Sequence, residues 1–340
     1  MRKLFKFTKF SQINCCYNSV KKRNLPVNGN PSASLARHLP LRGANIRISG
    51  CFTCSSDLSP PSGGFGGSVY TFIYMSTTKT IYQVDAFTTE AFKGNPAGVC
   101  ILENNMPEEW MQNVAMEMNL SETAFVVPDK DFFGIRFFSP EAEIPLCGHA
   151  TLSSSHILYE TGYVSREKEI KFLSKAGELI IRSEGSWVTM NFPAYGLERI
   201  EIPDSFERII GIRPSELHKT AHGWTFVLLG SESEVRDLKP DFKLMKNSGF
   251  GDMIVTAVSE DKNYDFCVRC FAPALGIDED PVTGSAHCAL VPFWHTRTGR
   301  NEFMSHQVSR RGGVLKVALK GDRVEISGQA RTIIRGELFV

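Results

Sequence analysis

Two short segments of the chain share a pattern suited to binding an anion. Residues 145–148 read Pro-Leu-Cys-Gly, residues 281–284 read Pro-Val-Thr-Gly, and a stretch typical of a helix follows each glycine. The start of a helix presents unpaired N–H groups and a partial positive charge, and glycine lets a ligand approach closely. Two such starts facing each other would hold a substrate carboxylate at Gly148 and Gly284. The alternative is that each glycine only makes a tight turn onto a buried helix.

Four polar side chains near these glycines could move or hold a proton. His149 and Ser285 directly follow the two glycines, and Asp280 lies in the acidic turn before the second. Glu122 opens an apolar strand in NLSETAFVV, where burial would raise its pKa from ~4.3 toward the range of a working base. The competing interpretation is a surface glutamate at a strand end. A lone histidine, likewise, is more often structural than catalytic.

An internal repeat places these residues in two similar halves. FFSPEAEIPLCGHATLSSSHILYETG begins at Phe137, and CFAPALGIDEDPVTGSAHCALVPFWHTRTG begins at Cys270. Each copy starts as an apolar strand ending in Phe-x-Pro, passes an acidic residue and a proline, and continues into a helix that ends near Gly162 or Gly299. The repeat predicts a duplicated fold with pseudo-two-fold symmetry.

Outside the repeat, the pattern is mostly that of strands. IYQVDAF, AGVCIL, TAFVV, IKFLS, ELIIRS and WVTMNF alternate apolar and polar positions, and one further helix is expected from Pro107 to about Met118. The predicted class is therefore α+β, with two pseudo-symmetric lobes, each a curved sheet or barrel around a central helix. We assign residues 77–195 to the N-terminal lobe and 196–340 to the C-terminal lobe.

The first 76 residues are expected to lie outside the fold. They hold ten Lys or Arg and one acid, a net of +9, and lack apolar periodicity. Basic, Ser-rich, acid-poor leaders are typical of organelle transit peptides. Met75 would serve equally as a native start. A real leader would imply a mitochondrial or plastid location, whereas a start at Met75 would imply the cytoplasm.

The charge and the motifs of the chain limit the classes of partner that it can be expected to bind. The chain's net charge of +1 leaves −8 for residues 77–340, which gives no basic footprint for nucleic acid. No stretch approaches the ~20 apolar residues of a membrane span. Nucleotide-binding glycine motifs are missing as well. We expect a small carboxylate-bearing substrate and leave a homodimer open.

The cysteines give little support for a metal site. Cys51/Cys54 lie in the leader, and Cys267/Cys270 lie in a strand-like segment where three-residue spacing directs the two sulfurs to opposite faces. Buried thiols acting as small hydrophobic groups are the default interpretation. We therefore expect no metal and no organic cofactor.

Four segments of the chain carry a family resemblance: VDAFTTEAFKGNPAGV, NLSETAF, IPLCGHAT and EDPVTGSAH. They are similar to the signature segments of the phenazine biosynthesis-like (PhzF) family, which the sequence resembles over residues 79–340. The resemblance implies the diaminopimelate epimerase-like fold, with the site in the cleft between two lobes. It also implies a cofactor-independent isomerase that moves a proton by general acid/base catalysis.

Carried over by matching positions, the resemblance makes Glu122 the general acid/base, with His149, Asp280 and Ser285 in the active site. The backbone at Gly148 and Gly284 would hold the substrate carboxylate. Related epimerases use one cysteine from each lobe, but here Cys147 is matched by Thr283, and an alcohol cannot be a second thiolate base. A dehydratase using Cys147 with Thr283 remains the alternative enzyme. A catalytically silent binding protein is the third hypothesis.

Overall fold

A computed structural model of the protein describes residues 78–340. The leader at 1–76, with its Met75 start and its Cys51/Cys54 pair, falls outside the described residues. Within the described range, the helices are all too short or too polar to cross a membrane.

The first lobe is mostly strand, as expected. It contains β1 (Lys79–Ala86), β2 (Asn95–Ile101), β3 (Glu122–Pro128), β4 (Phe133–Phe138), β5 (Glu143–Ile144), β6 (Ile170–Ser174), β7 (Gly177–Glu184) and β8 (Trp187–Pro193), with helices α1 (Glu108–Met118) and α2 (Gly148–Glu160). The six strands and the helix predicted from periodicity correspond to β1, β2, β3, β6, β7, β8 and α1.

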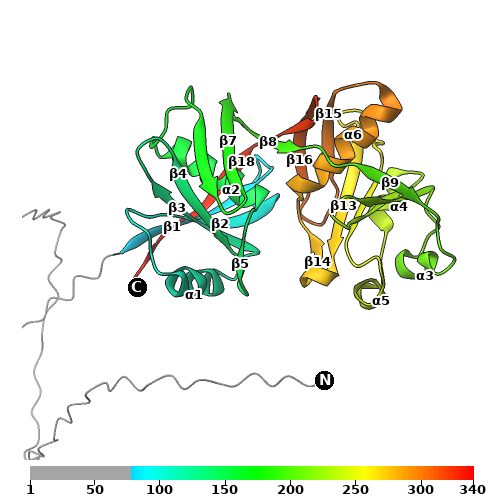
Figure 1. Cartoon of the computed structure of the whole chain (residues 1–340), viewed down its shortest axis with the longest axis horizontal. Coiled ribbons are helices and arrows are strands. Elements are labelled where there is room, and N and C mark those ends of the chain that lie inside the picture. Colours follow the sequence, from blue (N-terminus) through cyan, green and yellow to red (C-terminus); the bar gives the residue numbers. More distant parts are fainter. Residues whose placement is uncertain (1–77) are drawn as a thin grey trace, which may run out of the picture. The chain divides into compact units, whose positions relative to one another are not determined.

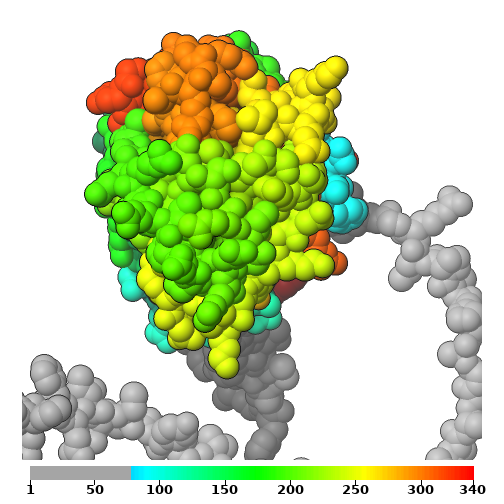
Figure 2. Space-filling view, turned by 90° about the vertical axis from the view of Figure 1, so that its right-hand side faces the viewer, coloured from blue at the N-terminus to red at the C-terminus, as the bar shows by residue number. Residues whose placement is uncertain are grey.

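The second lobe repeats this layout with more short helices (Figure 1). It contains β9 (Leu197–Ile200), α3 (Phe206–Ile210), β10 (Glu216–Thr220), β11 (Thr225–Leu228), α4 (Glu232–Asp237), α5 (Phe242–Lys246), β12 (Met253–Val258), β13 (Phe266–Ala272), η1 (Pro273–Leu275), β14 (Ile277–Asp280), η2 (Gly284–Ala286), α6 (His287–Thr298), β15 (Glu302–Gln307), β16 (Gly313–Lys320) and β17 (Arg323–Gly328). Figure 2 looks onto this lobe, whose outer face carries the segments coloured green to yellow.

The order of paired strands reveals the pseudo-symmetry. Strands β8 and β17 pair antiparallel with each other. Outward from β8 the order is β7, β6, β4, β3, β2, β1 and β18, and outward from β17 it is β16, β15, β13, β12, β11, β10 and β9. The parallel pairs fall at matching places, β4–β6 and β2–β3 in one lobe, β13–β15 and β11–β12 in the other. The duplicated two-lobed architecture is thus confirmed.

In the chain, the outermost strand of each lobe directly follows the innermost strand of the other lobe. β8 continues into β9 of the second lobe, and β17 continues into β18 (Ala330–Leu338), which pairs along β1. The division at 195/196 placed residues 330–338 in the second lobe, whereas their pairing places them in the first. Local periodicity marks a strand but not its distant partner, so the sequence could not show this exchange.

Each sheet curves around the helix that follows its glycine. Residues from His149 to Tyr159 of α2 are almost all buried, and α2 contacts β1, β2, β3, β8 and β18. α6 is buried along most of its length, from His287 to Trp294. A helix without a polar face belongs inside a fold, where its apolar surface is covered on every side.

The two helix starts differ in one detail. Gly148 begins α2 directly, but Gly284 begins the 3₁₀ turn η2, and α6 starts only at His287. The buried His287 ring lies 3.1 Å from the Thr283 carbonyl oxygen and 3.2 Å from that of Gly284. A side chain therefore takes carbonyls that α-helical amides would otherwise use.

Candidate active site

Both helix starts open into one cleft between the lobes. The cleft has a volume of about 920 Å³ and is open to solvent. All six residues proposed from the sequence line it, namely Glu122, Gly148, His149, Asp280, Gly284 and Ser285. α2 also contacts η2, so the two glycines lie on facing walls. This is the arrangement required for holding a carboxylate between them.

Glu122, His149 and Cys147 form a compact cluster at the start of α2. The His149 Nε2 atom lies 3.0 Å from a carboxylate oxygen of Glu122, and the Cys147 Sγ atom lies 3.4 Å from His149 Nδ1. The Glu122 side chain is 14% exposed and that of His149 is 9% exposed. Because β3 begins at Glu122 next to the cleft, its carboxylate is sheltered but reachable by a ligand.

The protonation of this cluster differs from the sequence-based expectation. Burial raises the pKa of Glu122, but the charge of His149 and hydrogen bonds from His149 and Cys147 outweigh it, so the net pKa is lowered. Burial lowers the pKa of His149, yet its acidic neighbours bring it well above 6.5. Glu122 is therefore an ionised base facing an imidazolium, and the expected rise in its pKa was wrong in direction.

The Cys147 thiol is a weaker candidate for a base. Burial raises its pKa and the nearby Glu122 charge adds to the rise, while the charge and hydrogen bond of His149 and the Ala150 amide oppose it without cancelling it. A thiol held protonated is neither a nucleophile nor a base. This electrostatic environment disfavours the cysteine-based mechanism, although Cys147 itself lines the cleft.

The same cluster holds the donors from which a metal site could be made. One ligand atom each of Glu122, Cys147 and His149 lies within 4.8 Å of the others. Zinc takes such a set only with a deprotonated thiol and a neutral imidazole. The raised pKa of both Cys147 and His149 opposes that state. Cys267 and Cys270 lie in different clusters on the two faces of β13, as their spacing predicted.

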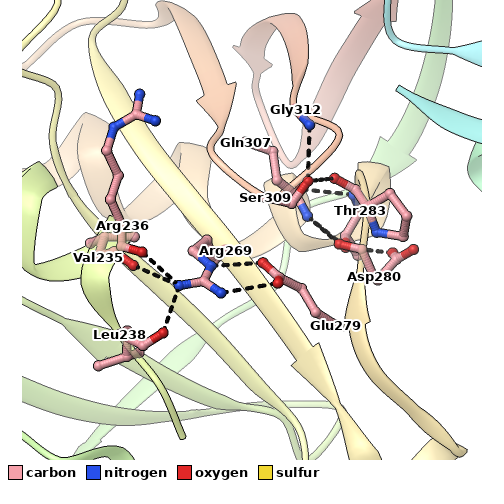
Figure 3. Close-up of polar contacts among 11 residues, drawn as sticks. Val235, Arg236, Leu238, Arg269, Glu279, Asp280, Thr283, Gln307, Ser309 and Gly312 are labelled. Atoms are coloured by element: carbon pink, nitrogen blue, oxygen red, sulfur yellow. Dashed lines mark hydrogen bonds and ion pairs between the residues drawn. The ribbon is translucent and has the colours of Figure 1, made fainter. Parts of the chain in front are cut away.

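Asp280 is held by hydrogen bonds from both lobes. Asn95 on β2 donates through Nδ2 to Asp280 Oδ1 at 2.8 Å and to the Val282 carbonyl oxygen at 2.9 Å. The Thr283 hydroxyl donates to Asp280 Oδ2 at 2.5 Å, and the Gln307 amide donates to the Asp280 carbonyl oxygen (Figure 3). With both carboxylate oxygens engaged, Asp280 is held in one orientation.

An arginine anchors the strand that carries Asp280. Arg269 binds the neighbouring Glu279 through two nitrogens, at 2.7 and 3.0 Å (Figure 3). A third nitrogen of Arg269 donates to carbonyl oxygens at the end of α4, namely those of Val235, Arg236 and Leu238. A bidentate arginine pair is rigid, so β14 holds Asp280 in a fixed position in the wall of the cleft.

Asn95 links the two lobes at the candidate site, and the sequence analysis does not single it out. Gly-Asn-Pro indicates a turn first, yet Asn95 is fully buried and its Nδ2 lies 3.3 Å from His149 Nδ1. It therefore joins His149 of one lobe to Asp280 of the other. The signal that could have revealed it is a polar residue that is buried at the start of a strand. That burial becomes apparent only when the position of β2 in the fold is known.

The loop before Asn95 is fixed to the second lobe. Arg311 donates to the carbonyl oxygens of Gly94 and Lys93 and to the buried Asp85 carboxylate, each at 2.8 Å. Gly94 has φ +65°, and a Cβ there would stand 2.1 Å from the Ala86 carbonyl oxygen. Only glycine can occupy this position.

We expect Gly94→Ala to lower the free energy of unfolding by about 2–4 kcal/mol, because a clash adds to an unfavourable φ. Gly162→Ala is the matched control, since Gly162 has φ +76° but no atom within 4 Å of its Cβ. The control should lose only about 1 kcal/mol. Urea unfolding measures both, and equal losses would show that backbone conformation alone matters.

The comparisons with known proteins agree with the fold. The sequence model of the phenazine biosynthesis-like protein family matches residues 84–336. An uncharacterized isomerase of Halalkalibacterium halodurans is 45% identical, over 77% of this chain and 99% of its own. The crystal structure of a PhzF-family protein from Enterococcus faecalis aligns with a TM-score of 0.75 at 40% identity, covering 77% of this chain and 100% of that one. A predicted epimerase of Pseudomonas aeruginosa, 20% identical, shares the fold with a TM-score of 0.61 over 77% of this chain and 99% of that chain.

Proposed function

The chain belongs to the phenazine biosynthesis-like (PhzF) family, and from that premise we propose that it is a cofactor-independent isomerase. Its substrate is a small amino or hydroxy acid, open or cyclic, whose carboxylate binds between the Gly148 and Gly284 helix starts. Glu122 removes a proton from one carbon and returns it to another. Support for the class comes from relatives named as isomerases.

One observation carries the proposal: the proton-moving pair exists in only one lobe. Thr123 pairs with Phe138 as Met253 pairs with Phe271, so Asp252 is the second-lobe counterpart of Glu122. Asp252 lies against Lys219 and the Ala274 amide and does not line the cleft.

At the other matched positions, Ser285 stands for His149 and Thr283 for Cys147. A two-base racemase needs a base on each face of its substrate. A single carboxylate instead suits a proton shift on one face of the substrate.

The chemistry then follows from the charges at the site. Ionised Glu122 accepts a proton from a substrate carbon that is next to a carbon–carbon double bond and becomes neutral, while the electron pair of the broken C–H bond is delocalised over that double bond. The imidazolium of His149 stabilises the negative charge that develops. Because the His149 charge lowers the pKa of Glu122, the protonated carboxyl is a ready donor, and the same proton can be delivered to a second carbon.

Deuterium exchange in heavy water tests the proposal directly. We expect the protein to exchange carbon-bound hydrogen in a panel of amino and hydroxy aromatic acids, read by NMR. Exchange should survive exhaustive dialysis against EDTA, since no step passes through a metal. Loss of exchange on dialysis, restored by zinc, would contradict cofactor independence. Tight binding of a panel acid without exchange of any would favour a silent binding protein.

The pH dependence of exchange gives a second prediction. The base form of Glu122 is required, and its pKa is lowered, so wild-type exchange should fall only below about pH 4.5. His149→Gln removes the main lowering influence and leaves burial, so the acid limb should move upward in pH. His156→Gln, on the same helix but beside Glu160, is the control and should leave the limb in place. If the acid limb were unshifted in His149→Gln, the charge of His149 would not control the pKa of the group that limits exchange.

A further inference from the structure

A side pocket of about 430 Å³ adjoins the cleft on the side of the second lobe. Tyr195, Trp224 and Ser285 line both spaces, so the two are continuous. The remaining walls of the side pocket are Thr220, His222, Ile254 and Ala286. The proposed proton transfer at Glu122 does not use this space.

Strand register shows what the side pocket is. Ile254 pairs with Cys270 as Ala124 pairs with Phe137, so Ile254 and Ala124 are counterparts. Ser285 and Ala286 are, by the repeat, the counterparts of His149 and Ala150. The side pocket is therefore the second lobe's copy of the corner where Glu122 and His149 meet. The fold has two half-sites, and only one carries the base.

The two copies differ because their hairpins differ. In the first lobe a loop at 87–94 separates β1 from β2, and it leads into the fully buried Asn95. In the second lobe β10 and β11 are joined by a tight turn, with Gly223 at φ +86° and the Gly223 amide donating to the Thr220 carbonyl oxygen. The short turn leaves His222 exposed at its tip, so the corner stays open.

Aromatic rings form much of the wall of the side pocket. The rings of Tyr195 and His222 lie 4.2 Å apart between centroids, and Trp224 and Ile254 complete an apolar surface. The Thr220 hydroxyl is already engaged by the Trp224 amide at 3.0 Å. Lysine, arginine and carboxylate side chains are not among the residues that line it. Such walls favour a planar apolar group, which gains from ring contacts and burial.

We propose that this side pocket binds an aryl ring of the substrate, so that the enzyme acts on aryl-bearing acids rather than on small aliphatic ones. The inference rests on the proposed function, since it places the carboxylate of the same molecule between Gly148 and Gly284. The first lobe then performs the chemistry, and the second lobe selects the substrate by its ring.

Calorimetric binding to the full chain tests this with matched acids. The probes are phenylglycine, phenylalanine and 2-amino-4-phenylbutanoate, which place the ring on tethers of increasing length, each compared with the amino acid lacking the ring. At one tether length the ring should tighten binding at least about tenfold, as burial of a phenyl group allows. Failure of every ring to improve affinity overturns the inference.

Variants locate the effect. The measured quantity is the ratio of the affinities for the acid with the ring and the acid without it. His222→Ala at the exposed turn and Trp224→Leu in the wall should both bring this ratio close to one. Trp187→Leu is the matched control, because Trp187 is also half-buried but lies on β8 away from this pocket. An advantage that survives both pocket variants places the ring elsewhere. Tighter binding of the acids with a ring, without any deuterium exchange, would support the ring pocket and contradict the isomerase assignment. Deuterium exchange without tighter binding of the acids with a ring would support the isomerase and contradict the ring pocket.

Discussion

Glu122→Gln should reduce deuterium exchange by about 10²–10⁴-fold, the usual loss when a general acid/base is removed. Glutamine keeps the shape of the side chain and its contact with His149 but cannot accept a proton. Substrate binding, measured by calorimetry, should therefore change little. The loss should appear in the rate and not in the affinity.

Cys147→Ala is the companion variant, because the alternative enzyme makes the opposite forecast. A dehydratase that uses Cys147 with Thr283 needs the thiol, whereas the Glu122 mechanism needs it only as a hydrogen-bonding neighbour. We expect exchange to persist in Cys147→Ala within about 10- to 100-fold, since a single hydrogen bond to the Glu122 carboxylate is lost. Exchange that persists in Glu122→Gln but vanishes in Cys147→Ala would replace the isomerase by the dehydratase.

Gly148→Val should weaken binding of a simple carboxylate such as benzoate by about 10- to 100-fold. A Cβ on Gly148 meets no atom within 4 Å, so valine would occupy the cleft in front of the α2 amides without disturbing the fold. Loss of charge-assisted hydrogen bonds to those amides accounts for an effect of this size. Gly148→Ala should give an intermediate loss.

Gly249→Val is the matched control, because Gly249 is exposed, has a similarly open Cβ and lies outside the cleft. Unchanged benzoate affinity in Gly148→Val would mean that the carboxylate binds elsewhere. Gly284 is less suitable for this test. A Cβ there lies 3.2 Å from the fully buried Phe87 ring, so valine would disturb the core as well as the site.

Sequence reasoning succeeded where the information is local. The helix at 108–118 has acidic residues in its first turn, and the strands alternate over several residues, so each is specified by its own segment. The repeat around Gly148 and Gly284 added the lobes and the cleft, because two similar segments must fold alike. These features follow from residues close together in the chain.

What could not be foreseen depends on partners far along the chain. Glu122 and His149 meet only when β3 lies beside α2, and that meeting reversed the expected direction of the Glu122 pKa. Asn95 gained its role from Asp280, which is 185 residues away. The side pocket required a comparison of two hairpins in register. No local pattern contains any of these pairings.

The pairing of β18 with the first lobe also has a consequence for synthesis of the protein. The first lobe's outermost strand, β18, is synthesised after the whole second lobe, although its partner β1 begins at Lys79. Until then the outer edge of β1 is unpaired and open to pairing with another chain. Domains that fold as units during synthesis usually complete the N-terminal one first. Here the N-terminal lobe is completed only after the whole second lobe has been synthesised, and a nascent chain stopped before Ala330 would leave the outer edge of β1 unpaired.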